Sequence, residues 1–300
     1  MVVCVSLLQA ILHSKCRETF ACAGEAKFSV SDGWGDGCWH GKYWSMDAMI
    51  LVFSAGVFAG AMNALAGGGS FVSLPALIAV GVPPVHANTS STVALFPGGL
   101  ASAWAYRDGL RPVGSVSLRA LLLATLCGGL VGAYLLLRTS SAAFTFVLPW
   151  LLLVASVALA FGRRIGEAMR TRWHIHASAV LAVQFVLGIY GGYFGGAVGI
   201  MMIAVWRLLD NCDLKHLNAD RTLLVSAANA VAVVAFIAAN AVRWPETLIM
   251  LMGAIIGGYS GARIGRRAPP GTIRTITLLV TFCITLAFFV KTYAATLLIR

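Results

Sequence analysis

The feature that most constrains the fold of this chain is a series of long, nearly uninterrupted apolar segments. A run of about 20 apolar residues is long enough to cross the hydrocarbon core of a bilayer. Backbone groups in lipid must find hydrogen-bond partners within their own segment, which makes each such run a helix. We therefore predict an all-α polytopic membrane protein, embedded in the lipid bilayer, with about eight transmembrane segments at 49–80, 86–106, 114–137, 142–161, 174–206, 222–242, 246–262 and 272–296.

The overall composition excludes several other classes of protein. Hydrophobic residues make up 59% and charged residues 11% of the chain, whereas soluble domains carry about 25% charged residues. This excludes a soluble enzyme, a disordered chain and a coiled coil. The net charge of +11 comes from arginine clusters between apolar runs, such as 162–164 and 263–267. Clusters of this kind are typical of cytoplasmic loops, so we expect no nucleic-acid partner.

The first 48 residues differ from the rest of the chain. They hold four of the seven cysteines, and their apolar stretch at 2–12 is too short to span a bilayer. We interpret 1–48 as an extension outside the fold, with Met46 or Met49 as the natural start. A signal peptide cleaved after Ala21-Cys22-Ala23 is the alternative, although its first residues lack the usual positive charge. No CxxC pair occurs, so we predict no metal site and no cofactor.

The chain repeats itself at a nearly constant offset of 129 to 132 residues. The segment from Gly56 to Gly60 matches that from Gly188 to Gly192, and Gly67 matches Gly199. The residues His86, Asn88 and Thr92 match His216, Asn218 and Thr222 in that order. The segment from Gly128 to Ala133 matches that from Gly257 to Ala262. We therefore divide the chain into a first transmembrane repeat at 49–161, a basic cytoplasmic linker at 162–173 and a second repeat at 174–300.

The first apolar segment of each repeat is too long for a single span. Segment 49–80 contains Gly67-Gly68-Gly69, and segment 174–206 contains Gly191-Gly192 and Gly195-Gly196. Each glycine in a helix interior destabilises it by about 1 kcal/mol relative to alanine, so we predict that both segments are broken or re-entrant. Repeated halves with broken segments at matching positions indicate a secondary transporter whose site lies between the repeats.

The positions of the arginines favour an inverted repeat. The segments 162–173 and 263–274 each hold four arginines, and in a simple count of eight spans they lie on opposite sides. If 174–206 crosses and returns, both lie in the cytoplasm, as the positive-inside rule requires. The two halves then have opposite orientations.

The stretch from Gly56 to Pro75, with its GxxxG and Gly67-Gly68-Gly69, followed by the polar run Asn88 to Thr92, resembles the TauE/SafE family of membrane transporters, the sulfite exporters. The resemblance covers about 49–296. It implies export of a small sulfur-containing anion, sulfite or an organosulfonate, across the bacterial inner membrane. The second half departs from the first, with Ile200-Met201 in place of two glycines and Arg207 in place of Pro75.

Two polar elements of each half are candidates for the anion site. Gly67 to Ser70 would expose backbone N–H groups, although glycines also allow close helix packing. The hydroxyls of 88–92 would suit sulfonate oxygens, although one of these residues would serve as an N-cap. In the second half, Arg221 would pair with the anion or with Asp213 or Asp220. Asn63 and Asn229 are among the polar residues deepest in apolar runs. The predicted substrate-binding residues are Asn63, Gly67, Gly68, Gly69, Ser70, Asn88, Thr89, Ser90, Ser91, Thr92, Gly195, Gly196, Gly199, Asn218, Arg221, Thr222 and Asn229.

The positions of the carboxylates and the absence of catalytic motifs limit the possible classes of function. All six carboxylates of 49–300 fall in loops or at segment ends, whereas buried sodium or proton relays normally use carboxylates within the membrane. A secondary transporter therefore competes with an anion channel or uniporter. A membrane-embedded enzyme would need a catalytic cluster, and neither G-x-S-x-G nor H-E-x-x-H occurs. We predict no catalytic residues, a small anionic substrate, and leave the oligomeric state open.

Overall fold

A computed structural model describes residues 46–105, 107–110, 116–170, 177–196, 198–206, 214–265 and 270–294. Apart from a few residues at its end, the predicted extension lies outside these residues. The described part is helical and contains no strand. Its helices are α2 (Met46–Ala66), α3 (Ser70–Ala79), α4 (Pro84–Ala105), α5 (Leu118–Arg138), α6 (Ser141–Arg170), α7 (Ala177–Tyr193), α8 (Val198–Trp206), α9 (Leu214–Ala238), α10 (Trp244–Gly265) and α11 (Pro270–Phe289).

Six of these helices are long and apolar enough to cross a membrane, namely α2, α5, α6, α9, α10 and α11. The helix α4 has 22 residues but carries the buried polar run 88–92, and α7 has 17 residues. The prediction of an all-α polytopic membrane protein is confirmed. One boundary differs from the expected organisation, because α6 continues through 162–170, where we placed the start of the linker.

Both long segments are broken at their glycines. Between α2 and α3 the backbone of Gly67 has a φ of 75°, and between α7 and α8 that of Gly195 has a φ of 76°. This left-handed region is readily accessible only to glycine. After the first break the chain folds back on α2, since a Cβ added to Gly69 would lie 2.5 Å from the carbonyl oxygen of Ala59. The helix α3 is therefore re-entrant.

Glycines hold two pairs of helices in close contact, and each pair joins one helix from each repeat. Along α2 and α10, Gly56 lies against Met250 and Gly60 against Ala254. Along α5 and α7, a Cβ at Gly128 or Gly132 would collide with the backbone of α7. Small residues of this kind let membrane helices approach backbone to backbone. In both pairs the residue numbers rise together along the two helices, so the helices are parallel.

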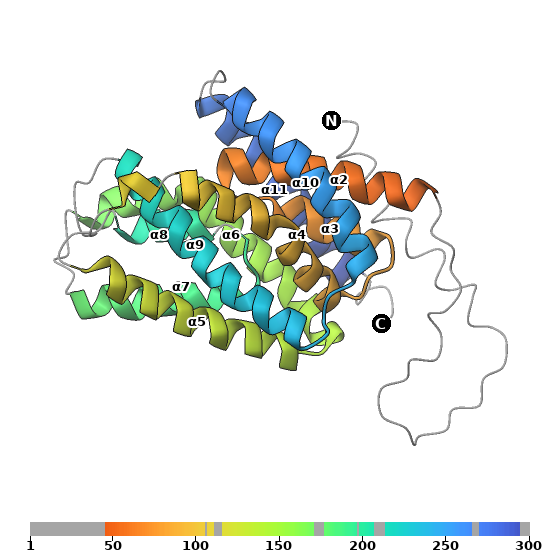
Figure 1. The fold of residues 1–300 in the computed structure, drawn as a ribbon, viewed down its shortest axis with the longest axis horizontal. Helices are drawn as coiled ribbons and strands as arrows, with labels where there is room; N and C mark the ends of the chain where they lie inside the picture. The colour runs from red at the N-terminus through yellow and green to blue at the C-terminus, as the bar shows by residue number, and fades with distance from the viewer. Residues whose placement is uncertain are drawn as a thin grey trace.

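The direction of these helices shows that the repeats are inverted. In Figure 1, α2 and α5 run in opposite directions along the long axis. Because α7 is parallel to α5, it is antiparallel to α2, its counterpart in the first repeat. The C-terminal ends of α6 and α10 lie toward the same end of the bundle (Figure 1). These ends lie within the two arginine-rich segments 162–173 and 263–274, as the inverted arrangement requires.

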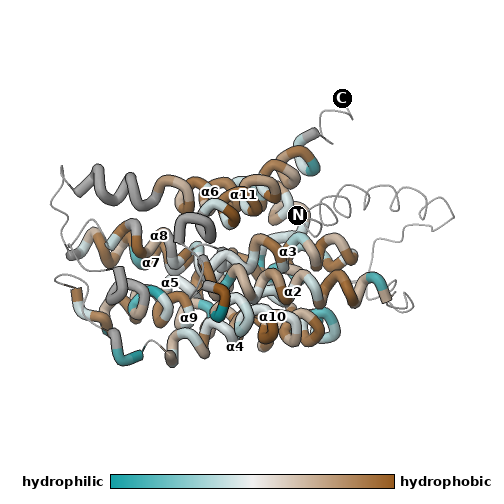
Figure 2. The backbone as a smooth tube through the Cα atoms, turned by 90° about the horizontal axis from the view of Figure 1, so that it is seen from above, coloured by the Kyte–Doolittle hydropathy of each residue, from teal (hydrophilic) through white to brown (hydrophobic). Residues whose placement is uncertain are grey.

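The helices form a layered bundle, with α6 and α11 on the side opposite α4 and α9 (Figure 2). Figure 2 shows α6 and α11 side by side in a mostly apolar layer at one face. A hydrogen bond of 3.0 Å between the hydroxyls of Ser156 and Thr285 joins this pair. The helices α4 and α9 pack against each other, and each also contacts further helices of the other repeat. This pair brings the two repeats together at the candidate site.

Candidate functional site

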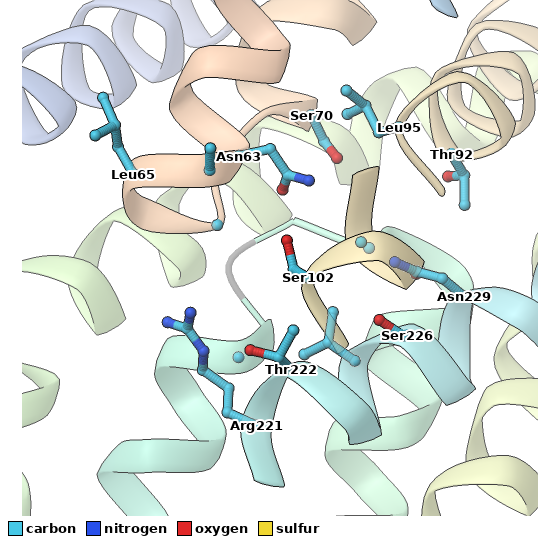
Figure 3. Close-up of a pocket in the computed structure, with 16 residues that line it drawn as sticks. Asn63, Leu65, Ser70, Thr92, Leu95, Ser102, Arg221, Thr222, Ser226 and Asn229 are labelled. Atoms are coloured by element: carbon cyan, nitrogen blue, oxygen red, sulfur yellow. The ribbon is translucent and has the colours of Figure 1, made fainter. Parts of the chain in front are cut away.

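A cavity of about 250 Å³ lies between the two repeats, at the breaks of the first segments (Figure 3). Four parts of the chain line the cavity. They are the end of α2 with the start of α3, the helix α4, the helix α9, and the break between α7 and α8 with the start of α8. The lining residues are Asn63, Ala64, Leu65, Gly67, Ser70, Thr92, Leu95, Gly99, Ser102, Gly195, Gly199, Arg221, Thr222, Val225, Ser226 and Asn229.

Ten of these residues form five pairs that occupy matching places in the repeats. The pairs, separated by the repeat offsets of 132 or 130, are Asn63 with Gly195, Gly67 with Gly199, Thr92 with Thr222, Leu95 with Val225, and Gly99 with Asn229. A cavity lined by matching residues of two inverted repeats lies on the pseudo-twofold axis that relates them. This is the position in which transporters of this architecture bind substrate.

The chemistry of the cavity favours an anion. Arg221 is the only charged side chain among the lining residues that the structure describes. Its aliphatic part crosses Gly199, where a Cβ would lie 2.9 Å from Cγ and Cδ of Arg221. Hydroxyls and amides supply the other polar groups, from Ser70, Thr92, Ser102, Thr222, Ser226, Asn63 and Asn229. The neighbouring Asp220 is buried and does not line the cavity.

The hydroxyls of Ser226 and Thr92, which both line the cavity, differ in their hydrogen bonding. The hydroxyl of Ser226 is buried and has no hydrogen-bond partner within the described protein. It points toward the middle of the cavity in Figure 3. The hydroxyl of Thr92 instead donates to the carbonyl oxygen of Asn88, 2.9 Å away on the same helix. A buried hydroxyl without a partner is unfavourable, so Ser226 marks a position where a ligand would supply one.

Comparison with known proteins places the chain among membrane transporters. The family model described as "Sulfite exporter TauE/SafE" matches residues 52–288. The chain belongs to the TauE/SafE family. A "Probable membrane transporter protein" of Haemophilus influenzae is 27% identical over 241 residues, which are 80% of this chain and 94% of that protein. The Escherichia coli K12 protein named "Probable membrane transporter protein YfcA" is 28% identical over 77% of this chain and 85% of its own length. No solved structure matches the chain significantly.

As a TauE/SafE protein, the chain is a multi-pass membrane protein of a transporter family. Both of these relatives are named as probable membrane transporters. No group of three or more His, Cys, Asp or Glu residues that could hold a metal ion occurs in the described part of the chain.

In this TauE/SafE chain, the structure brings nine of the predicted site residues to the cavity. These are Asn63, Gly67, Ser70, Thr92, Gly195, Gly199, Arg221, Thr222 and Asn229. Three predicted glycines lie outside the lining. A Cβ at Gly69 would meet Ala59, one at Gly68 would meet the ring of Phe71, and one at Gly196 would meet the ring of Phe194. These three glycines make room for close packing at the breaks.

The polar run of α4 is divided between packing and the cavity. Asn88 donates to the carbonyl oxygen of Tyr193 at 2.9 Å, and Thr89 donates to that of Ala241 at 2.5 Å. The hydroxyl of Ser90 accepts from the backbone N–H of Arg243 at 2.9 Å. The hydroxyls of Ser91 and Ser73 are 2.5 Å apart. Of 88–92, only Thr92 lines the cavity.

Two further polar residues, His86 and Gln184, do not line the cavity, and the predicted site residue Asn218 is described by its backbone alone. Asn218 lies in α9, and its side chain lies outside the described residues. The ring of His86 forms a hydrogen bond of 2.8 Å with the carbonyl oxygen of Ala241. Gln184 donates to Thr125 at 2.8 Å and accepts from Trp206 at 3.1 Å, so it joins α7 to α5 and α8. Gln184 therefore serves packing.

Sequence reasoning missed seven lining residues, namely Ala64, Leu65, Leu95, Gly99, Ser102, Val225 and Ser226. Helical spacing from the predicted threonines reaches most of them. Residues three, seven and ten positions after Thr92 are Leu95, Gly99 and Ser102, and Ser226 lies four positions after Thr222. Residues at this spacing share one helix face, so the faces of α4 and α9 could have been extended from Thr92 and Thr222.

Proposed function

We propose that this chain carries a small sulfur-containing anion, sulfite or an organosulfonate, out of the cell across the inner membrane. The observation that supports this most is the position of Arg221 in a cavity lined by matching residues of two inverted repeats. The name of the matching family points to the same class of substrate.

The chemistry of the lining fits such a cargo. A small anion that leaves water must exchange its hydration for donors held by the protein. One guanidinium supplies a planar set of N–H donors that suits the oxygens of a sulfonate. Hydroxyl and amide side chains around it, such as Thr222 and Asn229, add hydrogen bonds without a further permanent charge. This combination allows both binding and release.

Transport by the purified protein in proteoliposomes tests the proposal. Sulfite, sulfoacetate, taurine and thiosulfate would each be offered, with vesicles that lack the protein as the control. We expect uptake of at least one of these anions, with a much weaker apparent affinity in Arg221→Gln. Absence of uptake for all four, from protein shown to be folded, would contradict the proposal.

The same vesicles distinguish a carrier from a channel. A carrier shows counterflow, in which unlabelled substrate inside a vesicle drives uptake of labelled substrate from outside. An open pore does not, because its two sides are connected. The broken first helices of both repeats favour the carrier, so we expect counterflow.

A further inference from the structure

The cavity is asymmetric although the repeats that form it match. Where α9 has Arg221, the matching residue of α4 is Ser91, whose hydroxyl bonds to Ser73 outside the cavity. Where α9 has Asn229, α4 has Gly99. The polar groups therefore gather along α9, and the opposite face on α4 carries a threonine, a leucine, a glycine and a serine.

The charged and the neutral polar groups of α9 lie at opposite ends of the cavity. Figure 3 shows Arg221 at one side and Asn229 at the other, with Thr222 and Ser226 between them. Residues 222 and 226 are four apart, which is about 6 Å along a helix, and 229 lies about 4.5 Å further on. The cavity thus has a charged end at 221–222 and a neutral end at 226–229.

The neutral end holds one buried hydroxyl that has no partner among the described residues, together with the amide of Asn229. Ser226 is 4% exposed, and its hydroxyl has no hydrogen-bond partner within the described protein. The amide oxygen of Asn229 lies near Gly195, 3.8 Å from where a Cβ would be placed there. A hydroxyl on the ligand would accept from Ser226 and donate to the amide oxygen of Asn229, and a carbonyl on the ligand would accept from Ser226.

The volume of the cavity bears on the kind of anion that fits it. One water takes up about 30 Å³ in the liquid, so an inorganic oxyanion of a few heavy atoms fills only a fraction of a cavity of about 250 Å³. An anion with a short organic tail fills more of this space and reaches from one end of the cavity to the other.

We propose that the cavity holds its substrate in one orientation, with an anionic head group at Arg221 and Thr222 and an uncharged hydrogen-bonding tail at Ser226 and Asn229. This inference rests on the proposed function and narrows its substrate class. The site selects a sulfonate that carries a hydroxyl or carbonyl on its tail over a compact inorganic oxyanion.

Three probes separate head from tail: 2-hydroxyethanesulfonate, ethanesulfonate and sulfate. They would compete for uptake of labelled 2-hydroxyethanesulfonate by the full-length protein in proteoliposomes. We expect 2-hydroxyethanesulfonate to compete about three- to tenfold better than ethanesulfonate, because the tail hydroxyl gains a hydrogen bond and its absence leaves buried groups unpaired. Sulfate should compete least.

Two variants show whether the neutral end is responsible. In Ser226→Ala and in Asn229→Leu, the ratio between 2-hydroxyethanesulfonate and ethanesulfonate should fall toward one. Ser260→Ala is the matched control, since its hydroxyl bonds to Ile256 and Gly257 within α10, and it should keep the wild-type ratio. The proposed orientation is wrong if 2-hydroxyethanesulfonate and ethanesulfonate compete equally well in the wild-type protein. It is also wrong if both site variants still prefer 2-hydroxyethanesulfonate as strongly as the wild-type protein does.

The outcomes separate this inference from the proposed function. If ethanesulfonate competes as well as its hydroxylated relative and both depend on Arg221, the anion site stands and the orientation is wrong. If none of the probes is transported or competes, both the orientation and the site assignment fail.

Discussion

The hydroxyl of Thr89 on α4 donates a hydrogen bond of 2.5 Å to the carbonyl oxygen of Ala241, between α9 and α10. His86 bonds to the same carbonyl group, and Ser90 accepts from the backbone N–H of Arg243. These three contacts tie the start of the first repeat's central helix to the second repeat. They lie toward the N-terminal end of α4, whereas the cavity lining on α4 begins at Thr92 and extends toward its C-terminal end.

This arrangement predicts that the tie at 86–90 keeps one end of the cavity closed. Thr89→Val removes the hydroxyl but keeps the shape of the side chain. A hydrogen bond contributes about 1 kcal/mol, so the closed state should become about fivefold less favoured. The measurement is the labelling rate of Ser70→Cys, in a background without other cysteines, by a membrane-impermeant thiol reagent added on the side of Ala241.

Thr247→Val is the control for this prediction. The hydroxyl of Thr247 is also buried near the same turn, but it donates within its own stretch of chain to the carbonyl oxygen of Arg243. Faster labelling in Thr89→Val alone supports a closing role. Equal labelling rates in the wild-type protein and in Thr89→Val would show that the contact serves packing only.

The contact between α2 and α10 predicts opposite results at two adjacent glycines. A Cβ at Gly257 would collide with the carbonyl oxygen of Val57, whereas one at Gly258 would lie 3.9 Å from that of Gly60, an ordinary contact distance. Overpacking destabilises a folded protein by about 1–3 kcal/mol. Gly257→Ala should therefore lower the thermal unfolding midpoint in detergent, while Gly258→Ala should leave it close to wild type. Similar midpoints for the two variants would contradict the close helix contact.

The sequence reveals the helices, the two breaks and the inversion because each leaves a strong local signal. Apolar runs, glycine clusters, a repeated motif and the placement of arginines are all visible in the chain itself. It does not reveal which of the five polar residues at 88–92 face the cavity. Successive residues of a helix point about 100° apart, so five neighbours cannot share one face. The structure assigns Thr92 to the cavity and turns Thr89 and Ser90 toward the other repeat.

The geometry of Thr92 also changes the effect expected of its substitution. From the sequence, its hydroxyl is a donor for the anion, and its loss would reduce affinity by roughly 10- to 100-fold. In the structure that proton is donated to the carbonyl oxygen of Asn88, and the lone pairs left over repel an anion. We therefore expect Thr92→Val to change the apparent affinity for the transported anion by less than about threefold. A loss of tenfold or more, measured by uptake against concentration, would show that the hydroxyl turns to the substrate.

The last prediction concerns Arg221, whose counterpart in the first repeat is a serine. Arg221→Gln keeps a long polar side chain and removes the positive charge. A hydrogen bond to a charged group contributes about 1.5–3 kcal/mol, so the apparent affinity for the transported anion should fall by roughly 10- to 150-fold. Arg263→Gln is the matched control, because Arg263 is exposed at the end of α10, where its guanidinium lies 5.1 Å from the ring centre of Tyr259. Uptake would be measured against substrate concentration at equal amounts of folded protein in the vesicles. If both arginine variants transport like the wild-type protein, Arg221 does not bind the substrate and the anion site lies elsewhere.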